Sequence, residues 1–396
     1  MAHALIVGAG IAGDTLAVLL ERSGWRVTVV EIAPALRSGG QTVDLRGDSR
    51  EVLERMGLLD DALAALVPQR GMAWITARGR RLASMPVEAL GGRGFVSREE
   101  LLRTDLARIL HDATGEHVEH RFGDTVEALT ESPDGVTVRF RSGKDETFDL
   151  VVGADGAHSK VRALHFGDEE QYRKPLGLAH AWFTLREQPA TPPLGGWALV
   201  HNAAGRRAVA SRPGHSGEQE IGLTFEADSI PRGDREAQFA LLDREFDGVG
   251  WRAAEFLAAA RTAPDFALDT YEQIHMPTWS SGRVVLVGDS AWCTSPLSGL
   301  GTALGLHGAE QLAAALDRTG AKDDTAAISV AFKEFEAAMR PRAESAGQLI
   351  PGRVDMVAPK SRLAIIGNAL LMRLIQLRIM RGVVAKATAG SGHSVD

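Results

Sequence analysis

The stretch His3-Ala4-Leu5-Ile6-Val7-Gly8-Ala9-Gly10-Ile11-Ala12-Gly13 joins a short apolar run to three regularly spaced glycines. The apolar run is too short for a helix and is typical of a buried strand, and residues 15–20 have a helical composition. In the pattern G-x-G-x-x-G, the first glycine permits a tight turn, the second lets the backbone approach a pyrophosphate, and the third allows close helix–strand packing. The stretch therefore predicts a nucleotide-binding turn at the start of a helix.

A carboxylate supports this interpretation. Residues 27–30 (VTVV) form the next expected strand, and Glu31 ends it, where a carboxylate can accept hydrogen bonds from the ribose hydroxyls of an adenosine. The two strands and the helix make a β-α-β unit, which specifies a parallel sheet buried on both faces. The alternative is a glycine-rich turn with an ordinary surface glutamate.

Two later loops have a similar form. Asp155 and Gly156 come shortly after the apolar run Leu150-Val151-Val152, separated from it by Gly153 and Ala154, at the strand edge where doubly wound sheets bind ligands. An equally simple interpretation makes Asp155 the N-cap of the following helix. Asp289 follows the apolar run 284–287, and the glycine-rich stretch from Pro296 to Gly301 precedes an apolar helix. A carboxylate there suits a hydroxylated chain, and the bare backbone suits the face of a flat ring.

Composition narrows the class of protein. The chain has 396 residues and a net charge of −7, which argues against a general nucleic-acid partner. A single cysteine, Cys293, excludes an intrachain disulfide and fits a reducing cytoplasm. We expect it to be a small buried residue and not a nucleophile.

We see no signal peptide, and arginines interrupt the apolar stretch 363–384, which predicts an amphipathic helix and not a membrane span. The histidines are dispersed, so we expect no metal site.

We predict an α/β fold: a Rossmann-type domain, a second domain built on a mostly antiparallel sheet, and C-terminal helices. Strand-like segments separated by turn residues crowd together from about Leu178 to Met276, interrupted by a helical stretch at 235–263. Helices are also expected at 49–59, 98–111, 302–316, 330–349 and 363–385. The expected division is 1–175 and 279–340 for the nucleotide-binding domain, 176–278 for the substrate domain, and 341–396 for the C-terminal helical segment.

Taken together, the three loops resemble those of the class A FAD-dependent monooxygenases, aromatic and polyketide hydroxylases with the para-hydroxybenzoate hydroxylase fold. Residues 39–45 (GGQTVDL) and 97–102 (SREELL) look most like the branch that contains the tetracycline-inactivating monooxygenases. The resemblance implies FAD as cofactor, NADPH or NADH as reductant, and O2 activated as a flavin C4a-hydroperoxide that transfers one oxygen atom to an electron-rich carbon.

The resemblance also implies roles for individual residues. The FAD contacts would come from Gly8, Gly10, Ala12, Gly13, Glu31, Arg37, Asp44, Arg98, Asp155, Asp289, Pro296, Gly299 and Gly301. Asp289 would bind the ribityl chain, and Arg98 would reach the pyrophosphate or ribityl region. Arg37, Arg46 and Asp155 are candidates for the nicotinamide nucleotide. Arg37 and Arg98 could instead be surface or helix-end charges.

The sequence departs from the family pattern at three positions near the flavin. Trp292 stands where the family commonly has His, Ala303 where it has Asn, and Gly308-Ala309 where it has Asp-Ala. We expect the Trp292 ring to pack beside the flavin pocket. The strand region carries no family motif, so its substrate candidates rest on residue type alone: His180, Trp182, Trp197, His201, Arg207, Arg212 and Trp292.

The sequence thus predicts a monooxygenase that acts on an aromatic or polycyclic polyketide-like small molecule, as a cytoplasmic monomer or weak homodimer. Two alternatives remain. One is a reductase or oxidase of the same fold without oxygen insertion, and the other is a flavin-binding redox protein without turnover. The W-x-W-x-I-P segment of flavin halogenases does not occur.

Overall fold

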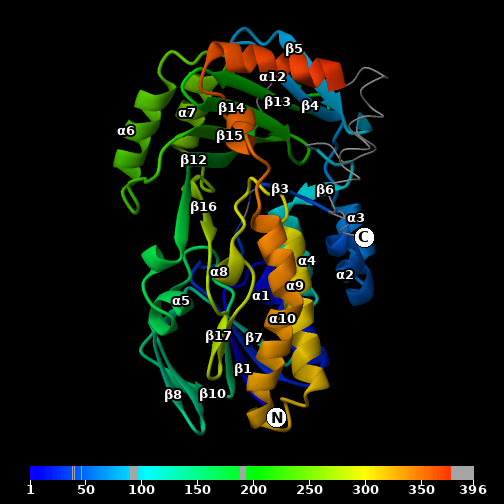
Figure 1. The fold of residues 1–396 in the computed structure, drawn as a ribbon, viewed down its shortest axis with the longest axis vertical. Helices are drawn as coiled ribbons and strands as arrows, with labels where there is room; N and C mark the ends of the chain where they lie inside the picture. Colours follow the sequence, from blue (N-terminus) through cyan, green and yellow to red (C-terminus); the bar gives the residue numbers. More distant parts are fainter. Residues whose placement is uncertain (38, 40, 46, 90–95, 188–192, 376–396) are drawn as a thin grey trace.

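The computed structural model describes residues 1–37, 39, 41–45, 47–89, 96–187 and 193–375. Two sheets dominate it, one in each half of the elongated molecule (Figure 1). The predicted α/β fold, with a Rossmann-type sheet, a mostly antiparallel second sheet and C-terminal helices, is confirmed.

The first sheet has six strands in the order β17-β18-β11-β1-β2-β7, parallel except for β17. Its members are β1 (His3–Val7), β2 (Arg26–Glu31), β7 (Val118–Phe122), β11 (Leu150–Gly153), β17 (Ser280–Ser281) and β18 (Val284–Leu286). The central strands are apolar along their whole length because helices cover one face and a three-stranded meander covers the other. The meander consists of β8 (Val126–Ser132), β9 (Gly135–Phe140) and β10 (Asp145–Phe148).

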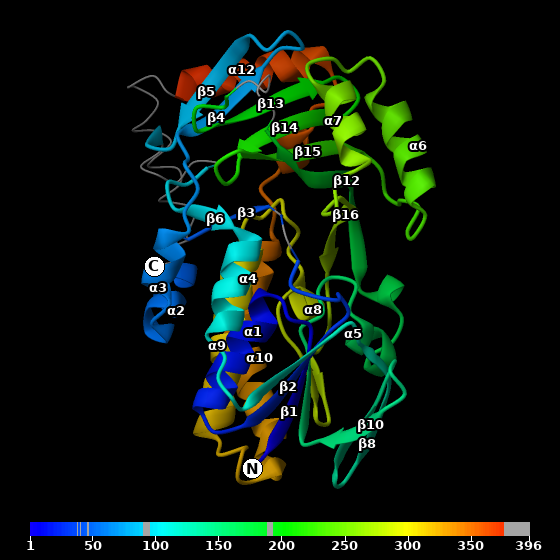
Figure 2. The same ribbon diagram turned by 180° about the vertical axis from the view of Figure 1, so that it is seen from behind.

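Three long helices pack together beside this sheet (Figures 1 and 2). They are α1 (Ile11–Arg22), α9 (Gly301–Arg318) and α10 (Ile328–Gly347). The expected helix over 49–59 is α2 (Asp48–Met56), which ends where Gly57 takes a left-handed conformation with φ of +75°. The short helices α3 (Leu59–Ala64), α5 (Lys160–His165) and α8 (Asp289–Trp292) complete this half.

The second sheet has the order β16-β12-β15-β14-β13-β4-β5, antiparallel except between β13 and β4. Its strands are β4 (Gly71–Ile75), β5 (Arg81–Pro86), β12 (Arg173–Arg186), β13 (Trp197–Ala203), β14 (Arg207–Pro213), β15 (Glu218–Glu226) and β16 (Ala267–Ile274). The strand-rich character expected from about Leu178 to Met276 is confirmed, because β12, β13, β14, β15 and β16 lie wholly or mostly in that region. The sheet also takes β4 and β5 from within the segment 1–175, so it is wider than residues 176–278 alone provide.

Helices flank the second sheet on both faces. The stretch expected to be helical at 235–263 forms two helices, α6 (Arg235–Phe246) and α7 (Ala253–Ala260), which bury an apolar face against β12, β14 and β15. On the other side lie α11 (Arg353–Val357) and α12 (Arg362–Ile375), with α12 against β5 and β13 (Figure 1). The remainder of the helix expected over 363–385 lies outside the described residues. None of the helices in the described ranges combines the length and apolar character that a bilayer crossing requires.

One predicted helix is partly wrong. The segment 98–111 was expected to be helical throughout, but Glu100–Leu102 forms the strand β6, and the helix α4 spans only Arg103–Asp112. β6 pairs with β3 (Thr42–Asp44) in a small antiparallel ribbon, and tertiary pairing therefore overrides the local helical pattern. This β3–β6 ribbon lies between the two large sheets (Figure 2).

Candidate active site

The glycine loop at residues 8–13 has the geometry that its pattern predicts. Gly8 has φ of +110°, and a Cβ on Gly13 would lie 1.9 Å from the carbonyl oxygen of Gly8, so neither position accepts a side chain. Gly10 is different: a Cβ there would have no neighbour within 4 Å among the described residues. Gly10 is the N-cap of α1, and no side chain caps this helix. The loop therefore leaves open space at an uncapped helix N-terminus, which suits a phosphate group.

Glu31 lies beside this loop. Its carboxylate accepts hydrogen bonds from the backbone N–H groups of Ala9 (3.0 Å) and Ala33 (2.8 Å). The glutamate is thereby fixed at the carboxyl end of β2, next to the helix N-terminus, where the sequence placed the ribose contact. Each carboxylate oxygen has a further lone pair for a hydroxyl group.

The third loop closes against the first. A Cβ on Gly305, in the first turns of α9, would lie 3.7 Å from the Cβ of Ala12, and one on Gly288 would lie 3.0 Å from the same atom. The N-termini of α1 and α9 are thus adjacent, and no side chain caps α9 either. Pro296 and Gly299 belong to the turn before α9, and a Cβ on Gly299 would meet nothing within 4 Å in the described structure. Two uncapped helix ends therefore share one open edge of the molecule.

Asp289 lies at this edge. It is the first residue of α8, half-buried, and a Cβ on Gly301 would be 3.8 Å from its Oδ1. Burial raises the pKa of Asp289, and the charge of Arg103 opposes that rise. Arg103 is the first residue of α4 and was not singled out from the sequence. The sequence offers no local signal for it, because Arg103 falls inside the helix expected over 98–111 and the β6 strand before it appears only in the fold.

Asp155 connects the second and third loops. Its carboxylate accepts hydrogen bonds from the N–H groups of Lys160 (2.7 Å) and Val161 (3.0 Å) in the first turn of α5, although the N-cap of that helix is Ser159 and not Asp155. It also accepts one from the hydroxyl of Ser290 (3.2 Å), the residue after Asp289. Arg162, fully buried and missed by the sequence reasoning, donates to the carbonyl of Ser290 at 2.9 Å. The observed contacts of Asp155 thus hold protein segments together.

The remaining basic candidates lie near the surface. Arg98 is exposed and forms an ion pair with Glu88 at 2.6 Å. Arg37 is exposed in the segment after β2, and Arg46 lies outside the described residues. Asp44 lies in β3 opposite Glu100 of β6.

One face of the second sheet carries a row of candidate substrate contacts. Strand register sets Trp182 beside Gly222 and Ala210, and His180 beside Thr224 and Ala208. The imidazole of His180 stacks with the Trp182 ring, with 6.0 Å between the ring centroids. His180 Nδ1 also forms a hydrogen bond with the Thr224 hydroxyl at 2.8 Å. Burial lowers the pKa of His180 to about 4, so the ring is neutral at pH 7. Small residues lie next to these two aromatic rings and make this part of the face largely apolar; we call it the aromatic floor.

Charged side chains lie at the border of this part of the sheet face. Arg212 lies in register with Glu220, and its guanidinium pairs with the buried Glu100 of the β3–β6 ribbon at 2.5 Å. Glu220 in turn accepts a hydrogen bond from the N–H of Thr42 at 3.0 Å. Burial raises the pKa of both carboxyls, although Arg212 opposes the rise. The Nε of Arg212 is buried and has no hydrogen-bond partner among the described residues.

Three other substrate candidates are not brought to this face, and we correct that expectation. His201 is buried on the α6–α7 side, bonded to the carbonyls of Ile75 and Val249. Arg207 donates to the carbonyls of Ala204 and Glu245. The ring of Trp197 lies under the guanidinium of Arg81, 4.6 Å from it. Residue type could not separate these from His180, Trp182 and Arg212, because the face depends on strand register.

Trp292 lies in the hydrophobic core of the first half of the molecule. The ring is buried in the core, 4.5 Å from the Trp279 ring and 5.9 Å from that of Phe335, and does not border the sheet face. A Cβ on Gly308 would lie 2.6 Å from Trp292 Cζ2, so the two departures from the family pattern complement each other. Cys293 is buried, and burial raises the pKa of its thiol, as expected for a structural residue.

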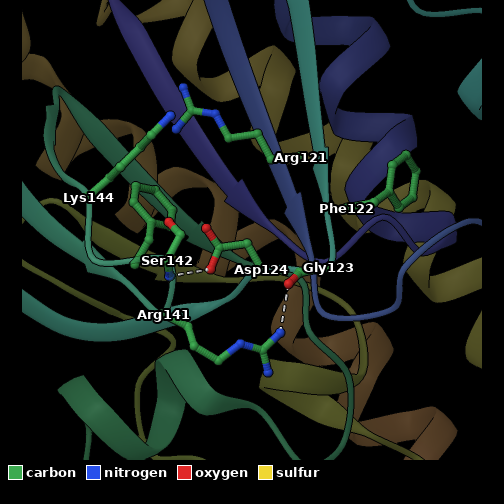
Figure 3. A pocket seen from close by; sticks show the side chains of 8 residues that line it. Arg121, Phe122, Gly123, Asp124, Arg141, Ser142 and Lys144 are labelled. Carbon is green, nitrogen blue, oxygen red and sulfur yellow. Dashed lines mark hydrogen bonds between the residues drawn. The ribbon is translucent and has the colours of Figure 1, made fainter.

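A hollow of about 370 Å³ lies on the meander side of the first sheet (Figure 3). Residues 121–124 at the end of β7 line it together with residues 140–142 and 144 of the meander. The Arg121 guanidinium is paired with Glu119 and Glu146. None of the residues predicted for FAD or substrate belongs to this hollow.

Comparisons with known proteins agree with this geometry. Residues 1–321 match the model of a family described as FAD binding domain. The chain belongs to this FAD-binding family. An uncharacterized protein of Mycobacterium tuberculosis is 41% identical over 323 residues, covering 81% of this chain and 86% of that protein. The FAD-dependent monooxygenase asL4 of Sarocladium schorii is 32% identical over 337 residues, covering 81% of this chain and 78% of the relative.

Solved structures of family members show the same fold. The crystal structure of the tetracycline destructase Tet(51) superimposes with a TM-score of 0.78 at 27% identity, covering 95% of this chain and 98% of that one. The predicted membership in the FAD-dependent monooxygenases of the aromatic hydroxylase family is confirmed, and the protein is an enzyme of that class. FAD is its cofactor, and the open, uncapped helix ends beside Glu31 and Asp289 fit that molecule.

Proposed function

We propose that the enzyme uses NADPH or NADH to reduce FAD and inserts one oxygen atom from O2 into an aromatic or polycyclic, polyketide-like small molecule. The observation that carries the substrate class is the sheet face with Trp182, His180 and an unsatisfied Arg212 Nε at its border. A large ring system covers such a floor, and an acidic ring oxygen suits a buried guanidinium N–H.

The cofactor contacts are assigned as follows. The N-terminus of α1 at Gly10 and Ala12 holds the pyrophosphate, with Glu31 on the adenosine ribose. Asp289 holds the ribityl chain, and Pro296, Gly299 and Gly301 give the flavin ring access to bare backbone at the N-terminus of α9. Arg103, whose positive charge acts on Asp289, takes the role near the ribityl chain that the family resemblance implied for Arg98. Arg37 and Arg46 remain the candidates for attracting the nicotinamide nucleotide.

When bound, FAD supplies the redox and oxygen chemistry, so the protein's own task is to bind, orient and keep water out. The positive end of α9 stabilises negative charge on the ring that it faces. Arg212 Nε donates to a phenolate or enolate oxygen, which keeps the substrate electron-rich for oxygen transfer. His180 stays neutral because its pKa is about 4. Tyr271 of β16, whose ring lies 5.6 Å from that of His180, keeps its hydroxyl proton because burial raises its pKa. The aromatic floor therefore adds no charge that would demand water.

The test uses the purified full-length protein. We expect a flavin spectrum, oxidation of NADPH or NADH that phenolic polycyclic compounds accelerate, and a product heavier by one oxygen atom. Reductant consumption without an oxygenated product would favour the reductase or oxidase alternative. Bound flavin without substrate-stimulated consumption would favour a redox protein without turnover.

An Arg212→Lys variant tests the proposed contact between Arg212 Nε and an acidic oxygen of the substrate. Lysine keeps the positive charge opposite Glu100 but lacks the Nε–H group. We expect KM for a phenolic substrate to rise about tenfold while FAD occupancy stays unchanged. An unchanged KM would contradict the proposed contact.

A further inference from the structure

Three side chains that no part of the monooxygenase site uses converge beside the glycine loop. Asp14 is the fourth residue of α1 and fully buried, His111 lies in the last turn of α4, and His120 lies in β7. His120 Nε2 is 3.1 Å from Asp14 Oδ1 and 3.2 Å from His111 Nδ1. The other oxygen of Asp14, Oδ2, is buried without a hydrogen-bond partner in the described structure. Histidines that are dispersed in the sequence are thus adjacent in the fold.

With Asp14 ionised, no set of two-centre hydrogen bonds satisfies all of these contacts. If His120 Nε2 carries a proton and donates to Asp14, it cannot also accept from His111. If His111 donates to His120 Nε2, the lone pair of that nitrogen is used and Asp14 faces it without a proton between them. In either case Oδ2 stays unsatisfied, which is costly for a buried carboxylate.

The same geometry suits a metal ion. Zinc binds histidine nitrogens and carboxylate oxygens at about 2.0–2.2 Å, and in a tetrahedron of that size neighbouring ligand atoms are about 3.3 Å apart. The observed separations of 3.1 and 3.2 Å are close to that edge length, and all three ligand atoms lie within 4.8 Å of one another. A cation would use one lone pair from each ligand atom and neutralise the buried carboxylate.

We propose that Asp14, His111 and His120 form a binding site for one Zn²⁺-type divalent transition-metal ion. Two imidazoles and one carboxylate are a ligand set of the type that such ions prefer. His111 and His120 are partly exposed, so the fourth position is open to a water molecule. The ion would join α1, α4 and β7 beside the cofactor loop without entering the substrate face.

A second cluster of possible ligands serves as a contrast. His158, Glu169 and Glu272 also lie close together, but their carboxylates already face cations. Glu272 pairs with Arg173, and Glu169 lies 3.8 Å from Arg162. His158 itself bonds to Asp269 at 2.9 Å. Glu272 Oε1 is also buried without a hydrogen-bond partner among the described residues, but the neighbouring Arg173 and Arg162 already balance the charge of these carboxylates. The group therefore gives a control for non-specific metal binding.

The experiment titrates the FAD-loaded full-length protein, stripped with a chelator, with Zn²⁺ alone. Isothermal calorimetry should show one saturable site per chain, and Co²⁺ should give the strong visible absorption of a tetrahedral site. Asp14→Asn, which keeps the shape of the side chain, and His120→Gln should each weaken Zn²⁺ binding at least tenfold and abolish the Co²⁺ signal. Far-UV circular dichroism and the flavin spectrum check that the variants are folded.

Two matched controls separate this site from other histidines. His117→Gln alters an exposed histidine in the segment just before β7, and His158→Gln disrupts the second cluster. Both should bind Zn²⁺ as the unmodified protein does. The proposal is overturned if the unmodified protein has no saturable site, or if Asp14→Asn and His120→Gln retain its affinity. If a variant does not fold, the unmodified protein alone decides: a six-coordinate, weakly absorbing Co²⁺ spectrum would also overturn the proposal.

Discussion

At the scale of single residues, Trp292 and Gly308 show how two departures from a family pattern form one feature. The indole occupies the volume that a side chain at position 308 would need. From the sequence alone each was a separate difference near the flavin, because the contact between α8 and α9 is visible only in the fold.

We therefore predict that Gly308→Ala lowers the free energy of unfolding by about 1–3 kcal/mol, since the added methyl overpacks a rigid core. The improved helix propensity of alanine offsets part of this loss. The same substitution in a Trp292→Phe background should cost clearly less, because the smaller ring leaves room. Urea unfolding of the two single variants and the double variant measures the coupling, and additive effects would contradict the contact.

His180 gives a prediction about pH. Its pKa is about 4 in the folded protein against an ordinary value of 6.5, so the unfolded chain binds more protons between these values. Stability from this residue is fully present above pH 6.5 and is lost as the pH falls toward 4. Between pH 7 and pH 5 the loss is about 2 kcal/mol by linkage. His180→Gln should show a correspondingly smaller decrease in urea unfolding over that interval, and an equal decrease would contradict the assignment.

Asp289 gives a prediction about the cofactor. Asp289→Asn keeps the shape of the side chain but removes the charge that faces Arg103 and weakens the acceptor for ribityl hydroxyls. We expect FAD occupancy after gel filtration to fall at least several-fold with unchanged circular dichroism. Asp155→Asn is the contrasting variant. Asp155 accepts hydrogen bonds from the backbone of α5 and from the hydroxyls of Ser159 and Ser290, all within the protein, so the variant should lower thermal stability more than it lowers FAD occupancy.

At the scale of elements, the β-α-β unit and its glycine loop could be predicted because all of their determinants are local. Spacing, strand length and the terminal glutamate lie within residues 3–31. The β3–β6 ribbon could not be predicted, because its two three-residue strands are far apart in the chain and β6 has the pattern of a helix start. Arg103, which acts electrostatically on Asp289, therefore begins α4 directly after β6, whereas Arg98 precedes β6 and pairs with Glu88.

Two glycines of the glycine loop should have different effects when substituted: Gly10 on FAD binding and Gly13 on folding. Gly10→Ala meets no atom within 4 Å and has an allowed φ of −94°, so the protein should fold but lose most of its FAD because the methyl occupies the phosphate position. Gly13→Ala would bring a methyl to 1.9 Å from a backbone oxygen and should unfold or displace α1. Flavin absorbance and thermal melting of both variants test this difference. Normal FAD occupancy in Gly10→Ala would place the phosphates elsewhere.

At the scale of the whole molecule, the two halves are joined through buried charge. Arg212 of the second sheet and Glu100 of the β3–β6 ribbon form one ion pair across the boundary. The sequence alone could not show that Arg212 and Glu100 pair with each other, because two residues so far apart in the chain leave no local pattern. The strand-rich texture did predict the second sheet, but its register, which decides which side chains share a face of the sheet, follows from strand pairing alone.

We predict that Arg212→Met lowers the free energy of unfolding by about 2–4 kcal/mol, because it leaves buried Glu100 and Glu220 without their cation. Adding Glu100→Gln should recover a large part of that loss, since it removes one of the uncompensated charges. Urea unfolding of the single and double variants gives the measurement. A double variant less stable than Arg212→Met would show that the pair does not act as a unit.

The order of strands in the first sheet has a consequence for synthesis of the protein. β1 pairs with β11, and β11 pairs with β18, so neighbours in space are separated by more than a hundred residues in the chain. The sheet that carries the glycine loop stays incomplete until residue 286 has left the ribosome, and the nascent chain exposes its apolar strands until then. Chaperone binding to this long intermediate, rather than early domain-by-domain folding, is the expected course of its biosynthesis.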